Sequence, residues 1–251
     1  MGLVVLTALG IGGVTVIGAI IGFAFKKIDE KWNDGILGFA AGIMLAAAIL
    51  GLIIPSMEQA GKSGIWMTVT GVLCGALFLN FADKLTPHLH HLTGVKEEEH
   101  KNNAHLNKVM LFVLAIAIHN LPEGLAAGVG VGAGDMGNAL TIAFGIALQN
   151  IPEGMIIISP MILSGVSKGR TFVIALMTGL VEVIGTFIGY LAAGVSAAVL
   201  PFCLAFAGGT MLYVISDEMI PETHSHGYER VATYALLMGF LVMILMDTFL
   251  A

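Results

Sequence analysis

Residues 109–133 read VMLFVLAIAIHNLPEGLAAGVGVGA, an apolar run whose one charged side chain, Glu123, lies near its centre. A helix rises about 1.5 Å per residue, so about 20 apolar residues cross a hydrocarbon core about 30 Å thick. The apolar residues are continuous and do not alternate with polar ones, which favours a helix over a strand of a barrel. The run therefore predicts a membrane-spanning helix with a carboxylate at mid-depth.

Apolar runs of similar length occur seven more times, so we expect an all-α polytopic membrane protein with eight transmembrane helices. Short turns and one longer segment, 83–108, connect the runs and leave no room for a soluble domain. The whole chain, 1–251, is expected to form a single transmembrane domain. The predicted spans are residues 3–25, 35–55, 64–82, 109–133, 138–163, 171–193, 197–216 and 231–250.

The composition excludes several other classes of protein. The 251 residues are 57% hydrophobic and 11% charged, with a mean hydropathy of +0.93, whereas soluble proteins carry about 25% charged residues. A net charge of −6 without a basic stripe argues against nucleic-acid binding. Two cysteines cannot build a disulfide framework. No nucleotide-binding motif is present, so neither a prosthetic group nor an ATPase subunit is expected.

Basic residues divide unevenly between the two sides that this span count defines. Ten of the eleven Lys and Arg residues lie in loops on one side, and only Lys62 lies on the other. Because an excess of Lys and Arg marks cytoplasmic loops, we expect both termini outside and segment 83–108 in the cytoplasm.

Segment 83–108 is rich in histidine and glutamate. Histidine-rich tracts can bind metals, and the alternative is that this segment is a plain solvated linker. The candidate loop ligands are His88, His90 and His91.

A six-residue pattern, [HQ]-N-x-P-E-G, occurs as HNLPEG at 119–124 and again as QNIPEG at 149–154. Its first and fifth residues are i and i+4, so they share one helix face. The proline removes a backbone donor and clashes with the carbonyl four residues earlier, so both helices should be kinked. A short turn at 133–137 makes the two helices antiparallel neighbours. We therefore expect the two motifs to face each other at mid-membrane.

Three glutamates, Glu123, Glu153 and Glu182, fall at the depth where charge is most costly. No Lys or Arg lies inside spans 109–133, 138–163 or 171–193, so cations or protons must be their partners. Imidazole, carboxylate and amide oxygen together suit Zn²⁺ or Fe²⁺, whereas Ca²⁺ and Mg²⁺ favour oxygen ligands alone. A single glutamate could instead be protonated and hydrogen-bonded between helices. The duplicated motif favours the metal interpretation.

With eight apolar spans, outside termini, a long cytoplasmic loop and H-N-x-P-E-G on the fourth span, the whole chain resembles the zinc/iron permease (ZIP) family of divalent metal transporters. It is most similar to short, bacterial-type members. The resemblance implies two adjacent metal sites, with Glu123 and Glu153 bridging them. The first would use His119, Glu123, Gln149 and Glu153, and the second Asn120, Asn150 and Glu182, together with the bridging carboxylates.

The resemblance also implies movement of Zn²⁺ into the cytoplasm, a homodimer, and a place in the bacterial cell (inner) membrane. Many members carry histidine where this chain has Gln149, so selectivity is expected to broaden towards Fe²⁺, Mn²⁺, Co²⁺ or Cd²⁺. Acidic residues near the outer ends of two spans are candidate entrance groups, and an acidic segment after residue 216 supplies candidate exit groups. These are Glu58 and Asp247 for the entrance, and Glu218, Glu222 and His224 for the exit.

Two other functions compete with metal transport. An intramembrane metallopeptidase would need His-Glu-x-x-His on a helix, but Asn120 follows His119 and no second histidine follows in that motif. A proton-coupled carrier of a non-metal solute, with the glutamates as a proton relay, is the serious alternative. Metal-dependent thermal stabilisation would separate it from a metal transporter.

Overall fold

The computed structural model describes residues 2–24, 29–92 and 103–250, and it leaves the side chains of 83–92, 103–112, 114 and 115 undescribed. Within these ranges the chain is helical, without strands. The α-helices are α1 (Gly2–Gly22), α2 (Glu30–Ala46), α3 (Ile54–Leu92), α4 (Asn103–Gly132), α5 (Met136–Leu163), α6 (Lys168–Ala193), α7 (Leu200–Val214), α8 (Ile220–Thr223) and α9 (Glu229–Leu250). Two π-helical segments, η1 (Ala47–Ile53) and η2 (Ile215–Met219), join α2 to α3 and α7 to α8.

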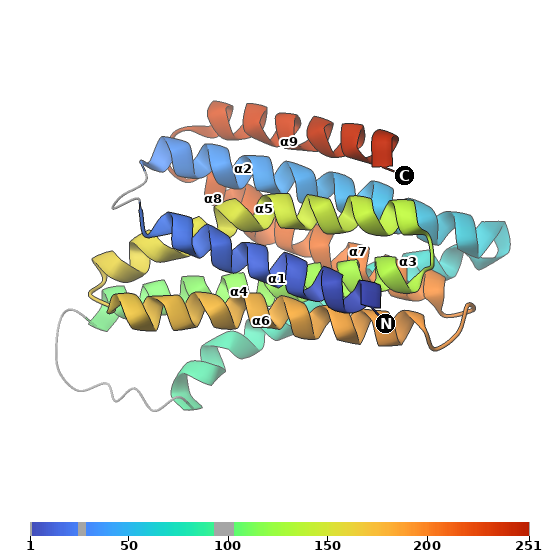
Figure 1. Ribbon diagram of the computed structural model, residues 1–251, viewed down its shortest axis with the longest axis horizontal. Coiled ribbons are helices and arrows are strands. Elements are labelled where there is room, and N and C mark those ends of the chain that lie inside the picture. Colours follow the sequence, from blue (N-terminus) through green and yellow to red (C-terminus); the bar gives the residue numbers. More distant parts are fainter. Residues whose placement is uncertain (1, 25–28, 93–102, 251) are drawn as a thin grey trace.

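The long helices lie side by side in one bundle (Figure 1). Helix α1 begins and α9 ends at the same end of this bundle, whereas α1 ends, α2 begins and α5 connects to α6 at the other. The described residues contain six helical stretches long and apolar enough to cross a membrane, one of them Glu30–Ala82. Helix α4, whose first third has no described side chains, is outside this set. The prediction of an all-helical polytopic membrane protein is confirmed at this level.

The connections between helices follow local sequence signals. Stretch Glu30–Ala82 contains one non-helical residue, Gly61, with φ 61° and ψ −175°, between predicted spans 35–55 and 64–82. Glycine adopts this backbone without the steric cost that a Cβ would add. Helix α5 begins after Asp135, whose Oδ1 accepts a hydrogen bond from the Asn138 backbone N at 3.2 Å. Helices α4 and α5 continue through their motif prolines.

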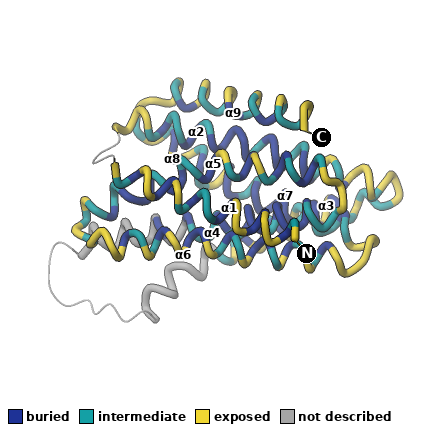
Figure 2. The backbone as a smooth tube through the Cα atoms, in the orientation of Figure 1, coloured by how far each residue is buried: buried dark blue, intermediate teal, exposed yellow. Residues whose placement is uncertain are grey.

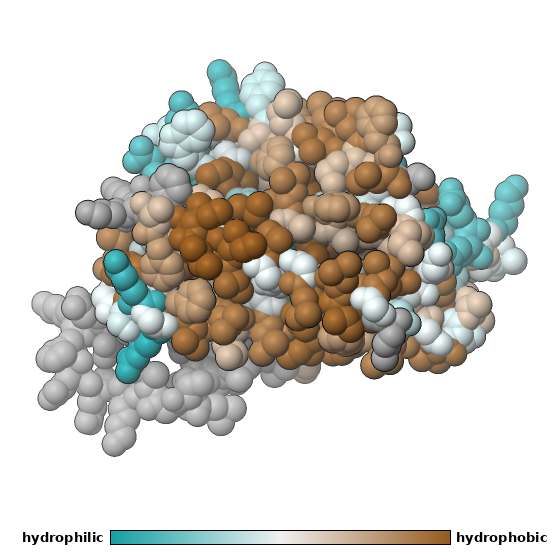
Figure 3. Space-filling view, viewed as in Figure 1, coloured by the Kyte–Doolittle hydropathy of each residue, from teal (hydrophilic) through white to brown (hydrophobic). Residues whose placement is uncertain are grey.

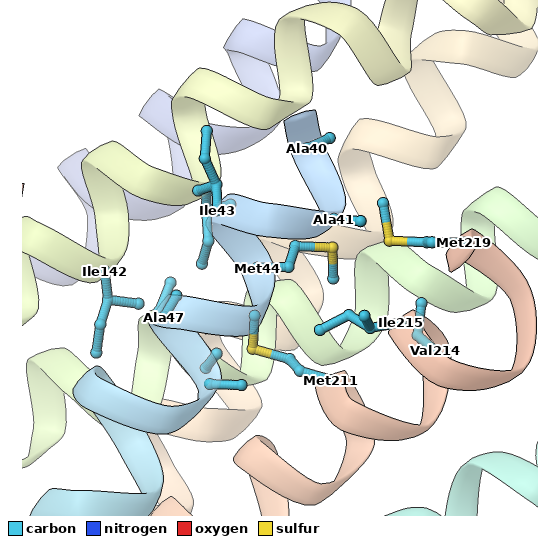
Figure 4. Packing of buried hydrophobic residues seen from close by; sticks show 14 of the residues in the cluster. Ala40, Ala41, Ile43, Met44, Ala47, Ile142, Met211, Val214, Ile215 and Met219 are labelled. Atoms are coloured by element: carbon cyan, nitrogen blue, oxygen red, sulfur yellow. The ribbon is translucent and has the colours of Figure 1, made fainter. Parts of the chain in front are cut away.

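The buried core lies along the inner faces of the helices (Figure 2). Its centre is where α2 and η1 meet α5 and the α7–η2 segment, and apolar side chains from all of them converge there (Figure 4). Both π-helical segments end two residues before a proline, Pro55 and Pro221. Proline lacks the backbone N–H that an α-helix uses, and a widened turn just before it removes the need for that hydrogen bond.

Helices α4 and α6 approach so closely that their backbones touch. A Cβ on Gly124 would overlap the carbonyl oxygen of Glu182, and a Cβ on Gly128 would overlap that of Thr186. Glycines let two helices in a membrane approach this closely, and the helices are then held together by van der Waals contact between their backbones. The contact therefore fixes Glu182 of α6 beside the HNLPEG motif of α4.

The surface of the bundle is apolar around its middle. Figure 3 shows hydrophobic residues across the centre of the visible face, with hydrophilic residues gathered towards the two ends. Large apolar side chains such as Leu6, Leu73 and Phe249 are more than half exposed. A soluble domain would not leave so continuous an apolar belt uncovered, so the belt marks the part of the molecule that lies against lipid.

Candidate functional site

Three helices, α1, α4 and α5, each bring a polar side chain to one carboxylate, Glu182 of α6. The Thr15 hydroxyl and the Asn120 amide both donate to Glu182 Oε1, at 2.6 and 2.8 Å. The Asn150 amide donates to Glu182 Oε2 at 2.6 Å. All four side chains are buried from solvent. Asn120, Asn150 and Glu182 were predicted together from the sequence, and the structure brings them into direct contact.

The two asparagine amides are anchored by a second acceptor each. Asn120 Nδ2 also donates to the Thr178 carbonyl at 3.1 Å, and Asn150 Nδ2 donates to the Ile11 carbonyl at 3.2 Å. Each amide nitrogen therefore donates two hydrogen bonds, to acceptors on α6 and α1. Their carbonyl oxygens, Oδ1, are left without a hydrogen-bond donor.

The repeated motifs also contact each other across α4 and α5. Gln149 Nε2 donates to Glu123 Oε1 at 2.7 Å, and both side chains are completely buried. The Glu123 carboxylate lies within electrostatic range of Glu153 and Glu182. Three carboxylates thus occupy one buried region, and the described buried side chains include no Lys or Arg to compensate them.

Unpaired oxygens collect at the same place. Native proteins hydrogen-bond nearly all buried polar atoms, so a group of unpaired ones needs an explanation. Among the described residues, eight buried side-chain atoms lack a hydrogen-bond partner, and half of them are oxygens of predicted site residues. A bound cation would satisfy such oxygens. They are Asn120 Oδ1, Glu123 Oε2, Gln149 Oε1 and Asn150 Oδ1.

The other two predicted ligands, His119 and Glu153, line a cavity of about 470 Å³. His119 Nε2 of α4 lies 2.6 Å from Glu218 Oε2 of η2, the segment between α7 and α8. In the described residues no three His, Cys, Asp or Glu side chains are grouped as a metal site. Any site formed by the predicted residues must therefore include amide oxygens among its ligands. The acidic residues that share the cavity with His119 and Glu153 are Asp217, Glu218 and Glu222.

The remaining candidates fall in different places. Glu218 and Glu222 line the cavity as an exit would require, but His224 is held at the end of α8, where its Nδ1 lies 2.9 Å from the Ile220 carbonyl oxygen. Glu58 is exposed and Asp247 half-buried, and neither has a hydrogen bond or ion pair to a described residue. The side chains of the predicted loop ligands, His88, His90 and His91, lie outside the described residues.

Sequence reasoning missed Thr15, Asp34 and His226. Thr15 is one hydroxyl in an apolar helix, and nothing in the sequence links it to Glu182, 167 residues away. Asp34 lies one residue before a predicted span and reads as a helix end. In the structure it is completely buried, and its Oδ1 is hydrogen-bonded to His226 Nδ1 at 2.9 Å. This pair joins the start of α2 to the segment between α8 and α9.

The hydrogen bond that the His226 ring donates to the Asp34 carboxylate raises the pKa of His226 above its usual range. A group whose pKa is raised by folding stabilises the fold below its unfolded pKa of about 6.5, and that contribution disappears as pH rises through the folded-state value. We expect His226→Gln to lower the melting temperature by a few degrees at pH 6 and by less at pH 9. Thermal unfolding in detergent at both values measures this, and an equal loss at both would contradict it.

Comparisons with known proteins identify the family of this chain. The family described as "ZIP Zinc transporter" matches residues 93–247. The chain is 40% identical to zinc transporter GufA of Myxococcus xanthus, over 98% of both chains. It is 36% identical to zinc transporter ZIPB of Bordetella bronchiseptica, over 93% of this chain and 77% of that one. Zinc transporter ZupT of Streptococcus mutans is 31% identical over 95% and 94%. The chain therefore belongs to the ZIP family of zinc transporters, whose members are transporters and not enzymes.

Proposed function

We propose that this protein is a secondary transporter that moves divalent transition-metal ions, Zn²⁺ first among them, through a two-metal site on α4, α5 and α6. The observation that carries the proposal is the group of unpaired oxygens beside three buried carboxylates. Unpaired buried oxygens and uncompensated carboxylates are each costly in a membrane, and one cation removes both costs. Fe²⁺, Mn²⁺, Co²⁺ and Cd²⁺ are the other substrates that such ligands suit.

The two sites would differ in chemistry. The site of His119, Glu123, Gln149 and Glu153 offers one imidazole nitrogen and suits Zn²⁺. The site of Asn120, Asn150 and Glu182, with the two bridging carboxylates, offers only oxygen. In the second site Thr15 holds Glu182 in place through its 2.6 Å hydrogen bond.

The direction of transport is proposed from the cavity that His119 and Glu153 line. This cavity reaches Pro221 and Ser225, near the end of the bundle where α2 and α6 begin. The first turns of these two helices carry Lys31, Lys168 and Arg170, which supports a cytoplasmic position. A metal leaving the site would therefore pass Glu218 and Glu222 into the cytoplasm. Glu58 and Asp247 remain the proposed entrance groups at the outer ends of their helices.

The topology and assembly are part of the same proposal. Eight spans with both termini outside agree with α1 starting and α9 ending at one end of the bundle (Figure 1). Proline-induced kinks in α4 and α5 would loosen the backbone beside the site. The bacterial relatives support a place in the bacterial inner membrane, and we propose a homodimer there.

Metal binding and flux test this function together. Purified protein should gain thermal stability in the presence of micromolar Zn²⁺, because a ligand that binds only the folded state stabilises it. Proteoliposomes should then take up Zn²⁺, with competing metals and pH varied to determine selectivity and proton coupling. The absence of any metal-dependent stabilisation or flux would instead favour a proton-coupled carrier of a non-metal solute.

Selectivity should respond to Gln149, the one amide in the proposed imidazole-containing site. Gln149→His adds a second imidazole, which Zn²⁺ prefers more strongly than Mn²⁺ does, so the ratio of Zn²⁺ to Mn²⁺ uptake should rise several-fold. Gln149→Asn keeps an amide and serves as the control, with no comparable change in the ratio. An unchanged ratio in an active Gln149→His variant would remove residue 149 from the proposed site.

A further inference from the structure

A second cavity, of about 650 Å³, opens on the lipid-facing side of the bundle, between α2, α5 and α9. Its walls are apolar and are formed mainly by Ile36 and Phe39 of α2, Leu148 and Ile151 of α5, and Ala235 and Met238 of α9. Helices α2 and α9 touch beside it, since a Cβ on Gly38 or Gly42 would overlap the α9 backbone. The cavity is therefore closed where α2 and α9 meet, and we call it the α2–α9 groove.

One end of the α2–α9 groove carries charge of both signs. Lys31 and Trp32 line the groove and also line an adjoining polar pocket of about 380 Å³, together with Asp29, Glu30 and Tyr228. None of the ion pairs between described residues involves Lys31. This polar pocket lies at the start of α2, where basic residues and aromatic side chains mark the membrane interface.

We propose that the α2–α9 groove binds one phospholipid whose headgroup contains a primary ammonium, of the phosphatidylethanolamine type. The acyl chain lies in the apolar groove, the phosphate contacts Lys31, and the ammonium donates hydrogen bonds to Asp29 and Glu30. A headgroup without an amine would place its phosphate beside two carboxylates, with Lys31 as the one described cation in the pocket lining to balance all three groups. A choline headgroup has the positive charge but no N–H to donate, so it matches the carboxylates less well.

The length and volume of the α2–α9 groove suit an acyl chain. Lys31 and Phe39 are eight residues apart on α2, which is about 12 Å along the helix and close to the thickness of one leaflet, about 15 Å. The groove volume of about 650 Å³ is within the range of small-molecule sites, about 300–1,000 Å³.

The bound acyl chain would contact α5 on the side of this helix that faces away from the proposed metal site. Leu148, Ile151 and Pro152 line the groove, whereas Gln149 and Glu153 of the same helix face the buried carboxylates and the inner cavity. A lipid in the groove therefore contacts α5 directly and separates part of it from α2 and α9. Its presence would influence how tightly α5 packs there.

Native mass spectrometry of the full-length purified protein tests the proposal. Delipidated protein would be mixed with phosphatidylethanolamine, phosphatidylcholine or phosphatidylglycerol carrying the same acyl chains. We expect one phosphatidylethanolamine per chain to be retained about tenfold better than either of the others. Ala235→Phe, which fills the groove, should remove this preferential binding. Leu237→Phe is the matched control, because Leu237 is an exposed residue of α9 that does not line the groove.

The headgroup is tested separately by Asp29→Asn combined with Glu30→Gln, which should bring retention of the ethanolamine and choline lipids close to equality.

Met238→Trp replaces Ala235→Phe if that variant does not fold, because Met238 is 57% exposed on the groove. Equal retention of all three lipids by the unchanged protein would overturn the proposal in favour of ordinary annular lipid. A dimer that dissociates when the groove is filled would overturn it in favour of a second copy of the chain.

Discussion

Replacing Glu123 by alanine should abolish zinc uptake into proteoliposomes. Glu123 is completely buried, accepts a hydrogen bond from Gln149, and has a second oxygen without a partner. In the proposed arrangement it belongs to both metal sites, so its loss removes a ligand from each. Loss of a group that merely supports a metal ligand often costs about 10–100-fold in affinity or activity, so uptake should fall by more than about 100-fold. Glu153→Ala should behave in the same way.

The matched control is Glu229→Ala, which removes a carboxylate from an exposed position at the start of α9, outside the proposed path. It should retain most of the uptake. Both variants should elute as the unchanged protein does and keep its helical content, because alanine favours a helix. A folded Glu123→Ala variant that still transports zinc would show that the ion follows another path.

Introducing valine at Gly128 should prevent the protein from folding. The Cβ of any residue there would overlap the backbone of α6 at Thr186, and neighbouring Gly124 is in the same position against Glu182. The obstacle is main chain, so no side-chain rotation relieves it. Helices α4 and α6 would have to separate, which would also pull Asn120 away from Glu182. We expect little or no monodisperse protein after purification in detergent.

Gly13→Val provides the comparison, because a Cβ at Gly13 of α1 meets no atom within 4 Å. The same substitution in another membrane helix should therefore leave yield and melting temperature nearly unchanged. Normal yield and stability for Gly128→Val would mean that α4 and α6 are not packed as closely as described.

Much of the fold could be predicted from the sequence because a membrane imposes a simple rule on length and polarity. Each predicted span overlaps a helix, and the turn at 133–137 lies where α4 gives way to α5. The π-helical segments could not be predicted, because their neighbouring prolines are compatible with several local backbones. The continuation of α3 to Leu92 was also missed, since polar residues after 82 resemble a loop.

The candidate site was only partly accessible from sequence. Helical spacing placed Asn120 and Glu123 on one face, and the repeat pointed to Asn150 and Glu153. Spacing within a helix cannot identify a partner on a distant one, so the hydrogen bond from Thr15 to Glu182 was not foreseen. For the same reason nothing predicted that His119 would lie beside Glu218.

The close approach of α4 and α6 has an evolutionary consequence. When two side chains pack together, enlargement of one can be offset by a reduction of the other, and such positions drift as covarying pairs. At Gly124 and Gly128 the opposing atoms belong to peptide groups, which are the same whatever residue α6 carries. No compensating substitution exists there, so these glycines should stay invariant among relatives even where the metal ligands diverge to change selectivity.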